Sequence, residues 1–322
     1  MAEKGRSASL SIPGKAEAPA TLGPFRKELR RNYDLYLLLV PGFLFFLIFS
    51  YIPMGGLVIA FKDYNLFKGV FASDWAGMTH FKEMLEIPAF WQMVRNTLTL
   101  NVLSLLIGFP APILLALMLN EVRAKYFKKI SQSLLYLPHF MSWIVLGGIV
   151  YNILSPKYGI VNELLRGGGF EEIYFMVDKF WWVFVYTLSG VWAAAGWGTI
   201  IYLAAMTAID PHLYEAAVID GAGRFRKIWN ITLPGIMPTV VVLLILNIGQ
   251  MVSIGIEQPL ALTNPVVTDV SEVISTYIYS VGIKQGEFGL TTAVGMVQSV
   301  INLILILGAN HLAKRMGREG IW

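Results

Sequence analysis

Six long stretches of this 322-residue sequence contain no Asp, Glu, Lys or Arg. Each stretch is longer than the roughly 20 residues that an α-helix needs to cross the hydrocarbon layer of a membrane. A β-barrel would instead show shorter segments of alternating polarity. The sequence therefore predicts an all-α membrane protein with six transmembrane helices. The stretches cover residues 35–61, 96–120, 130–156, 180–209, 228–256 and 288–313.

The composition agrees with a membrane location and excludes several kinds of chemistry. With 56% hydrophobic and only 14% charged residues, the chain is too apolar for a soluble protein of this length. Cysteine is absent, which rules out disulfides, thiolate nucleophiles and Cys-ligated metals. The four histidines lie far apart, without metal-ligand spacing, so neither a metal site nor a cofactor is expected.

Lysine and arginine predict the orientation, because cytoplasmic loops of membrane proteins collect them. The N-terminal tail, loop 121–129, loop 210–227 and the C-terminal tail hold 17, against 8 on the opposite side. Both termini should therefore be cytoplasmic, and no nucleic-acid partner is needed to explain the net charge of +4. Residues 1–30 are predicted to be a flexible cytoplasmic tail, and residues 31–322 a six-span domain. The first apolar run is too long for a cleaved signal peptide and should remain as an anchor.

The loop of residues 210–238, between the fourth and fifth predicted spans, carries strong local signals. Asp210 is a good N-cap and Pro211 suits the first helical position, so a short helix is expected from Pro211 to about Ala222. Gly221 can release the chain from helical geometry. Residues 224–229 should form an amphipathic arm. Prolines 234 and 238 are expected to break this arm and redirect the chain into the fifth span.

This loop also contains a spaced motif: Glu215-Ala216-Ala217, then Gly221, then Ile231-Thr232-Leu233-Pro234. In this motif the chain resembles the integral membrane permeases of ATP-binding-cassette (ABC) importers. The form of the motif is similar to the carbohydrate-uptake, maltose-permease-like branch of that family. The resemblance implies the type I ABC importer permease fold, with a cytoplasmic coupling helix that docks on a separate ATPase.

The resemblance also implies roles for residues of the loop and a set of partners. The sequence has no phosphate-binding loop, so ATP hydrolysis would belong to another subunit and this chain would not be an enzyme. The implied partners are a second homologous permease in a heterodimer, two ATPase subunits, an extracytoplasmic solute-binding protein and membrane lipid, in the bacterial cytoplasmic membrane. The coupling residues would be Glu215, Ala216, Ala217, Asp220, Gly221, Ala222, Leu233 and Pro234.

Uncharged polar side chains within the spans are candidates for a sugar path, because sugars bind to amides and aromatic faces. Asn247 and Gln250 come first, since the fifth span begins at the coupling loop. Hydrogen bonding between helices is the alternative role for each of these amides. The further candidates are Asn152, Gln298, Asn302 and Trp143.

The predicted function is import of a sugar, specifically an oligosaccharide, driven by ATP. An ABC importer permease for phosphate, amino acids or peptides is the main alternative, although the spans offer no Lys or Arg to receive such charged solutes. A channel or ion-coupled carrier is a weaker alternative, because the spans lack the acidic residues that relay ions. An intramembrane enzyme is weaker still, since no nucleophile or metal cluster lies in a span.

Overall fold

A computed structural model describes residues 32–317 and 320–321. The chain divides into two compact units, one that ends at Gly56 and one that begins at Leu57. The first unit contains α-helix α2 (Tyr33–Phe46), π-helix η1 (Leu47–Tyr51) and α3 (Ile52–Met54). The 3₁₀-helix η2 (Gly55–Phe61) continues into the second unit. Residues 33–61 together are long and apolar enough to cross a membrane, as predicted for the first span. The predicted tail, residues 1–30, lies outside the described residues.

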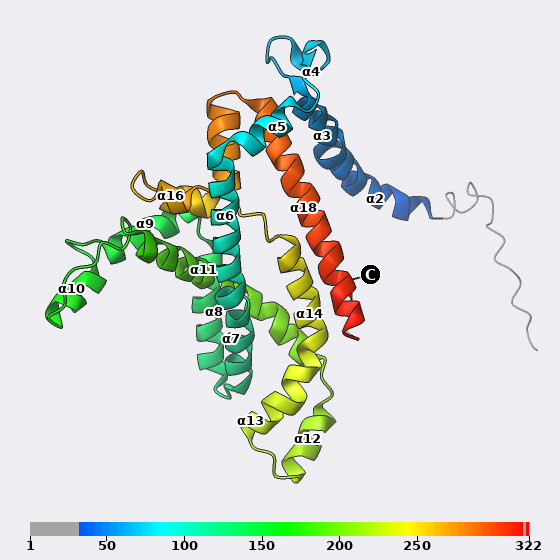
Figure 1. The fold of residues 1–322 in the computed structure, drawn as a ribbon. Coiled ribbons are helices and arrows are strands. Elements are labelled where there is room, and N and C mark those ends of the chain that lie inside the picture. The colour runs from blue at the N-terminus through cyan, green and yellow to red at the C-terminus, as the bar shows by residue number, and fades with distance from the viewer. Residues whose placement is uncertain (1–31, 318–319, 322) are drawn as a thin grey trace, which may run out of the picture. The chain divides into compact units, whose positions relative to one another are not determined.

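The second unit contains the other spans (Figure 1). Four of its helical stretches are long and apolar enough to cross a membrane. The first consists of α6 (Pro88–Leu103), η3 (Ser104–Gly108) and α7 (Pro110–Glu121), and the second is α11 (Lys179–Thr207). The third consists of α13 (Arg224–Lys227), η5 (Ile228–Thr232) and α14 (Leu233–Gly249), and the fourth is α18 (Phe288–Arg315). The shorter elements before α6 are β1 (Lys62–Asp63), α4 (Gly69–Ala72), β2 (Asp74–Trp75) and α5 (Thr79–Glu86). Shorter elements between the later stretches are α10 (Ile160–Gly167), α15 (Glu257–Leu262), α16 (Thr268–Ser271), α17 (Ile274–Tyr277) and η6 (Ile278–Lys284).

The third predicted span is bent rather than straight. Helix α8 (Lys125–Tyr136), its 3₁₀ extension η4 (Leu137–Phe140) and α9 (Trp143–Leu154) meet at an angle of 107°. Pro138 lacks a backbone donor, and Ser142 has extended backbone angles and caps α9 by accepting a hydrogen bond from the Val145 N–H. With this pair counted as one span, the number of spans is the six that the sequence predicts.

The expected break between the cytoplasmic arm and the fifth span is wrong. Residues 224–249 form one continuous helical stretch, with Pro234 in the first turn of α14 and Pro238 inside it. The π-helical turn η5 comes directly before α14, and a local change of hydrogen-bonding register of this kind is a common way for a helix to accommodate a proline. Movement at the α13 end of this stretch can therefore reach α14 through unbroken helix.

The second span begins earlier than the sequence predicts. Helix α6 starts at Pro88, which suits a first helical turn, rather than near Asn96. Asn96 is buried, and its amide donates hydrogen bonds of 2.9 Å to the carbonyls of Asp269 and Glu272 in the connection between the fifth and sixth spans. Lys179 pairs with the Asp269 side chain and holds the pKa of that carboxyl below its ordinary value. These contacts hold the connection against α6 and the start of α11.

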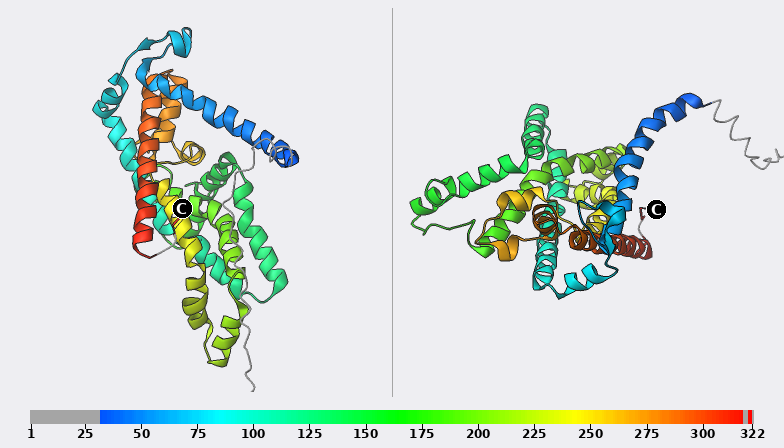
Figure 2. Two further views of the ribbon diagram at one scale, coloured as in Figure 1. Left: turned by 90° about the vertical axis from the view of Figure 1, so that its right-hand side faces the viewer. Right: turned by 90° about the horizontal axis from the view of Figure 1, so that it is seen from above.

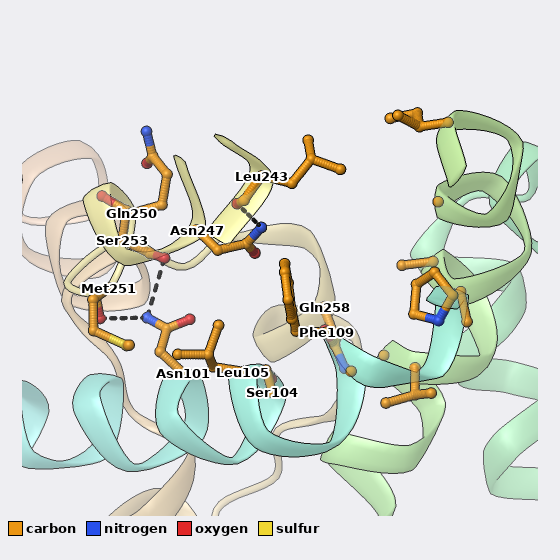
Figure 3. A pocket seen from close by; sticks show the side chains of 18 of the residues that line it. Asn101, Ser104, Leu105, Phe109, Leu243, Asn247, Gln250, Met251, Ser253 and Gln258 are labelled. Atoms are coloured by element: carbon orange, nitrogen blue, oxygen red, sulfur yellow. Dashed lines mark hydrogen bonds between the residues drawn. The ribbon is translucent and has the colours of Figure 1, made fainter. Parts of the chain in front are cut away.

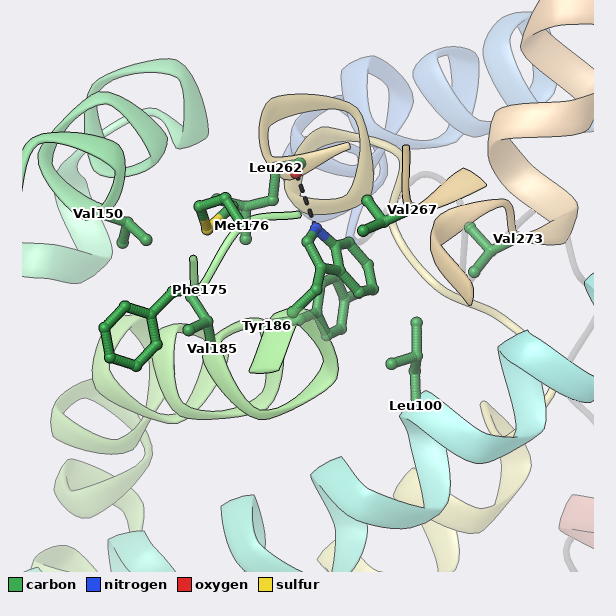
Figure 4. Packing of buried hydrophobic residues seen from close by; sticks show 10 residues of the cluster. Leu100, Val150, Phe175, Met176, Val185, Tyr186, Leu262, Val267 and Val273 are labelled. Atoms are coloured by element: carbon green, nitrogen blue, oxygen red, sulfur yellow. Dashed lines mark hydrogen bonds between the residues drawn. The ribbon is translucent and has the colours of Figure 1, made fainter. Parts of the chain in front are cut away.

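Two buried clusters hold membrane helices of the second unit together. In the first, the fully buried Trp182 belongs to one cluster with the side chains labelled in Figure 4, and its indole N–H donates to the Leu262 carbonyl at 2.9 Å. In another, Tyr202 and Met206 of α11 pack with Ala116 of α7 and Ile236 of α14. Figures 1 and 2 show α14 running beside α18, and α14 also contacts α11 of the fourth span.

Small residues let neighbouring helices approach α11, as is common in the packing of transmembrane helices. A methyl group on Gly196 would overlap the backbone carbonyl of Leu135 in α8, and one on Gly198 would lie 3.0 Å from the Pro112 ring in α7. The backbone of α11 is thus in close contact with two other spans.

Candidate coupling loop and membrane cavity

The predicted coupling helix is present as α12, Pro211–Ile219, at the end of the second unit opposite α5 (Figure 1). The Asp210 carboxylate accepts a hydrogen bond of 2.9 Å from the His212 N–H, which confirms its predicted role as N-cap. Pro211 occupies the first turn. The helix ends at Ile219, three residues before the predicted end.

The early end of α12 follows from the backbone of Gly221, whose φ of +74° lies in the left-handed region. The Ala222 N–H donates to the Ala217 carbonyl at 2.8 Å, and the Gly221 N–H donates to the Val218 carbonyl at 3.0 Å. This pair of bonds is the Schellman ending of a helix, which strongly favours glycine at this position. Asp220 is the last residue before the turn, at the C-cap. The fixed glycine of the motif therefore closes the helix.

The surface of the coupling loop combines exposed apolar side chains with polar groups, among them the carboxylate of Glu215. None of the residues of α12 is buried. Ile219 and Phe225 are 86% and 88% exposed, and Trp229 is 72% exposed. Glu215 is also exposed, and its carboxylate lies 3.2 Å from Nδ1 of His212. A large exposed apolar patch around a polar group is typical of a protein-binding surface.

Side-chain contacts fasten α12 to the membrane helices. The Tyr214 hydroxyl and the Thr232 hydroxyl are hydrogen-bonded at 3.0 Å, which joins α12 to η5. Thr232 is buried and directly precedes Leu233 and Pro234 of the motif, which begin α14. Arg224 of α13 lies 3.8 Å from the carboxylate of Glu121 at the end of α7. The Tyr214–Thr232 bond thus joins α12 to the helical stretch of the fifth span, and the Arg224–Glu121 pair joins that stretch to the second span.

A cavity of about 490 Å³ lies between the second, fourth and fifth spans. Helices α6, η3 and α7 form one wall, α11 a second, and α14 with residues 250–258 a third (Figure 3). Among the described residues, no charged side chain lines it. Its polar groups are amides and hydroxyls, and its aromatic groups are Phe109 and Tyr202. The polar lining residues are Asn101, Ser104, Asn247, Gln250, Ser253 and Gln258.

The structure brings together the two candidates that the sequence ranked first and separates them from the rest. Asn247 and Gln250 both line the cavity. The Asn247 amide also donates to the Leu243 carbonyl of its own helix at 2.8 Å, as Figure 3 shows. Within the described part of the chain, the side chain of Gln250 has no hydrogen-bond partner. This leaves its amide available to a bound solute.

The other four candidates do not line this cavity. Asn152 donates to the Gly148 carbonyl of its own helix at 2.8 Å, and Trp143 packs against the cluster around Trp182. Gln298 and Asn302 of α18 bind the chain near Ser253. Gln298 and Asn302 thus hydrogen-bond a neighbouring segment of the chain. This is the kind of contact predicted from the sequence as the alternative to sugar binding, hydrogen bonding between helices.

Two amides of the cavity were missed in the sequence. Asn101 belongs to the second charge-free stretch and met the same criterion as Asn247, so a search for amides within the spans could have found it. Gln258 follows Glu257, which ends the fifth charge-free stretch, and only the return of α15 into the bundle brings its side chain to the cavity. The described residues contain no group of three His, Cys, Asp or Glu side chains that could hold a metal ion.

Comparisons with known proteins extend over nearly the whole chain. Residues 108–318 match the family described as binding-protein-dependent transport system inner membrane component. The polygalacturonan/rhamnogalacturonan transport system permease protein YteP of Bacillus subtilis is 47% identical, over 96% of this chain and 99% of that protein. The arabinooligosaccharides transport system permease protein AraP of the same organism is 28% identical, over 88% of this chain and 90% of that protein.

A solved structure is also similar to this chain. It is a chain in the crystal structure of a bacterial alginate ABC transporter in complex with an alginate pentasaccharide-bound periplasmic protein. The two chains are 41% identical and align with a TM-score of 0.83, over 92% of this chain and 99% of the other. The region that matches the family, residues 108–318, includes the coupling loop, α11 and α14.

Proposed function

Since the chain belongs to the family of binding-protein-dependent transport system inner membrane components, we propose that it is one permease subunit of an ATP-driven importer that moves oligosaccharides into the cytoplasm. Membership confirms the resemblance drawn from the motif at 215–234 and the type I ABC importer permease fold. The chain is a multi-pass membrane protein and a transport subunit, not an enzyme.

The observation that carries the substrate proposal is the uncharged, amide-lined cavity. Amides and hydroxyls can exchange hydrogen bonds with the hydroxyl groups of a saccharide, and Phe109 and Tyr202 offer apolar surface to sugar rings. The saccharides named for the similar proteins are acidic in some cases and neutral in others. Both kinds of saccharide carry hydroxyl groups. Phosphate, amino acids and peptides fit less well, because the described lining offers no cation or anion to pair with them.

The partners proposed for this chain follow from the coupling loop and from the family. The exposed apolar surface around Glu215 would dock on a cytoplasmic ATPase, of which the complete transporter would contain two. An extracytoplasmic binding protein would deliver the saccharide, as the family description indicates. A second, unlike permease would complete the cavity. Both termini and loop 210–238 would then be cytoplasmic, in agreement with the distribution of Lys and Arg.

The test is uptake by proteoliposomes that contain this chain with its partner permease, ATPase and binding protein. The ligand that copurifies with the binding protein is identified by mass spectrometry and supplied in labelled form. We expect an oligosaccharide, taken up only when ATP is present on the ATPase side. Capture of phosphate, an amino acid or a peptide would contradict the substrate class, and uptake by this chain alone without ATP would favour a channel or carrier.

Replacing both Asn247 and Gln250 with leucine should lower the rate of oligosaccharide uptake roughly tenfold, since two amide partners of the sugar are lost. ATP hydrolysis without substrate should change little, because the coupling loop is untouched. Asn152→Leu is the matched control: this residue also donates to the carbonyl four residues before it, but it lies outside the cavity. Equal loss of uptake in the control and the double variant would count against the cavity as the sugar path.

A further inference from the structure

The fifth span stops being helical inside the helical bundle. Helix α14 ends at Gly249 and α15 begins at Glu257, so residues 250–256 lie outside regular helix. Gln298, which contacts this segment, is ten residues from the start of α18, or roughly 15 Å along the helix. Non-helical backbone within a membrane must find its hydrogen bonds in side chains of the protein or in water.

Two amide side chains of α18 supply many of these hydrogen bonds. Gln298 donates to the Val252 carbonyl at 2.6 Å and to the Ser253 hydroxyl at 3.2 Å. Asn302, one helical turn later, donates to the same hydroxyl at 2.6 Å and accepts from the Val252 N–H at 3.3 Å. The hydroxyl of Ser253 therefore receives two donors from one face of α18.

A third amide holds the same segment from the opposite helix. Asn101 of α6 donates to the Met251 carbonyl at 2.8 Å and to the Ser253 carbonyl at 3.2 Å (Figure 3). The segment Met251–Ser253 is thus held between the second and sixth spans. Beyond it, Gln258 donates to the Tyr186 carbonyl of α11 at 2.7 Å, which holds the start of α15 in the same way.

The segment held by these amides is also part of the cavity wall, because Gln250, Met251 and Ser253 all line it. Gln298 and Asn302 themselves do not. We infer that Gln298 and Asn302 are positioning residues, which hold the non-helical segment of the fifth span so that the side chain of Gln250 faces the transported solute. The inference rests on the proposed function for what occupies the cavity, and on the hydrogen bonds described above for how its wall is held.

The absence of cysteine allows the segment to be probed directly. A methyl group on Gly255 would have no atom within 4 Å, so Gly255→Cys can carry a nitroxide spin label next to the held segment. The full-length chain is labelled in lipid nanodiscs and its electron paramagnetic resonance spectrum recorded. In the Gln298→Leu/Asn302→Leu variant, the mobile fraction of the label should roughly double, since four hydrogen bonds to the segment are lost.

The controls separate local release from general damage. Ser299→Leu places leucine at the next position of α18, where the exposed serine hydroxyl bonds only the Gly295 carbonyl of its own helix, and should leave the spectrum unchanged. A label at Gly308, which also has open space, should report an intact α18 in every variant. If the double leucine variant is too unstable to purify, Ser253→Ala removes the shared hydroxyl without changing α18, and should increase mobility at position 255 by a smaller amount.

An unchanged spectrum at position 255, or an equal change at 255 and 308, would overturn the inference. The spectrum needs no sugar, ATPase or binding protein, so its outcome is independent of the proposed function. Oligosaccharide uptake by the same variants tests the functional part: it should fall in Gln298→Leu/Asn302→Leu and stay normal in Ser299→Leu. Increased mobility together with normal oligosaccharide uptake would overturn the positioning role of these residues while leaving the proposed function intact.

Discussion

Replacing Gly221 with valine should abolish the stimulation of ATP hydrolysis by the loaded binding protein while leaving the membrane subunit folded. The φ of +74° at Gly221 is disfavoured for residues with a Cβ by about 1–2 kcal/mol, and more for a β-branched one. None of the residues of α12 is buried, so packing within the chain cannot offset this cost. Because about 1.4 kcal/mol corresponds to a factor of ten, the stimulated rate should fall at least roughly tenfold.

Gly223→Val is the matched control for this prediction. Gly223 has a φ of −67°, which valine can adopt, and a methyl group there would have no atom within 4 Å. This variant should keep most of the stimulated ATP hydrolysis. Thermal unfolding of both purified variants should be close to that of the original chain. Full stimulation in Gly221→Val would show that the left-handed end of α12 is not needed for coupling to the ATPase.

The features predicted best from the sequence are those set by local chemistry. Long charge-free stretches predict spans because an apolar run of this length crosses a membrane as a helix, which satisfies its own backbone hydrogen bonds, and Asp210 with Pro211 predicts the start of α12 through capping alone. Gly221 was expected to end the helix or allow close packing, and its backbone does end it. Each of these predictions depends on only a few neighbouring residues.

The errors concern positions where the effect of a proline depends on its surroundings. Pro138 sits at a 107° bend that is completed by the cap at Ser142, whereas Pro234 and Pro238 lie within continuous helix. The sequence shows only that a donor is missing at each of these positions. Whether the chain turns there depends on the flanking turn: the π-helical turn η5 before Pro234 keeps the helix unbroken.

The residues that line the cavity could be predicted only in part, because a side chain lines the cavity only when its face of the helix is turned toward the neighbouring helices. Asn247 and Asn152 are both amides within spans, and both bond their own helix four residues back. Only the packing of α14 against α11 and η3 places Asn247 in the cavity. Gln298 and Asn302 are also sugar-path candidates in the sequence, yet their amides bond the backbone of Val252 and the hydroxyl of Ser253.

Replacing Gly196 with alanine should destabilise the chain strongly, because even a methyl group would overlap the Leu135 carbonyl of α8. Backbone cannot move aside as a flexible side chain can, so we expect the cost typical of overpacking, about 1–3 kcal/mol, and a fall in the apparent melting temperature of about 4–10 °C. Gly148→Ala in α9, where a methyl group would have no atom within 4 Å, is the control and should melt within about 2 °C of the original chain. The melting temperatures are measured on the full-length chain in lipid nanodiscs. Equal melting of the two variants would mean that α8 can move away from α11 at little cost, and that the bend at Pro138 is not held by their close packing.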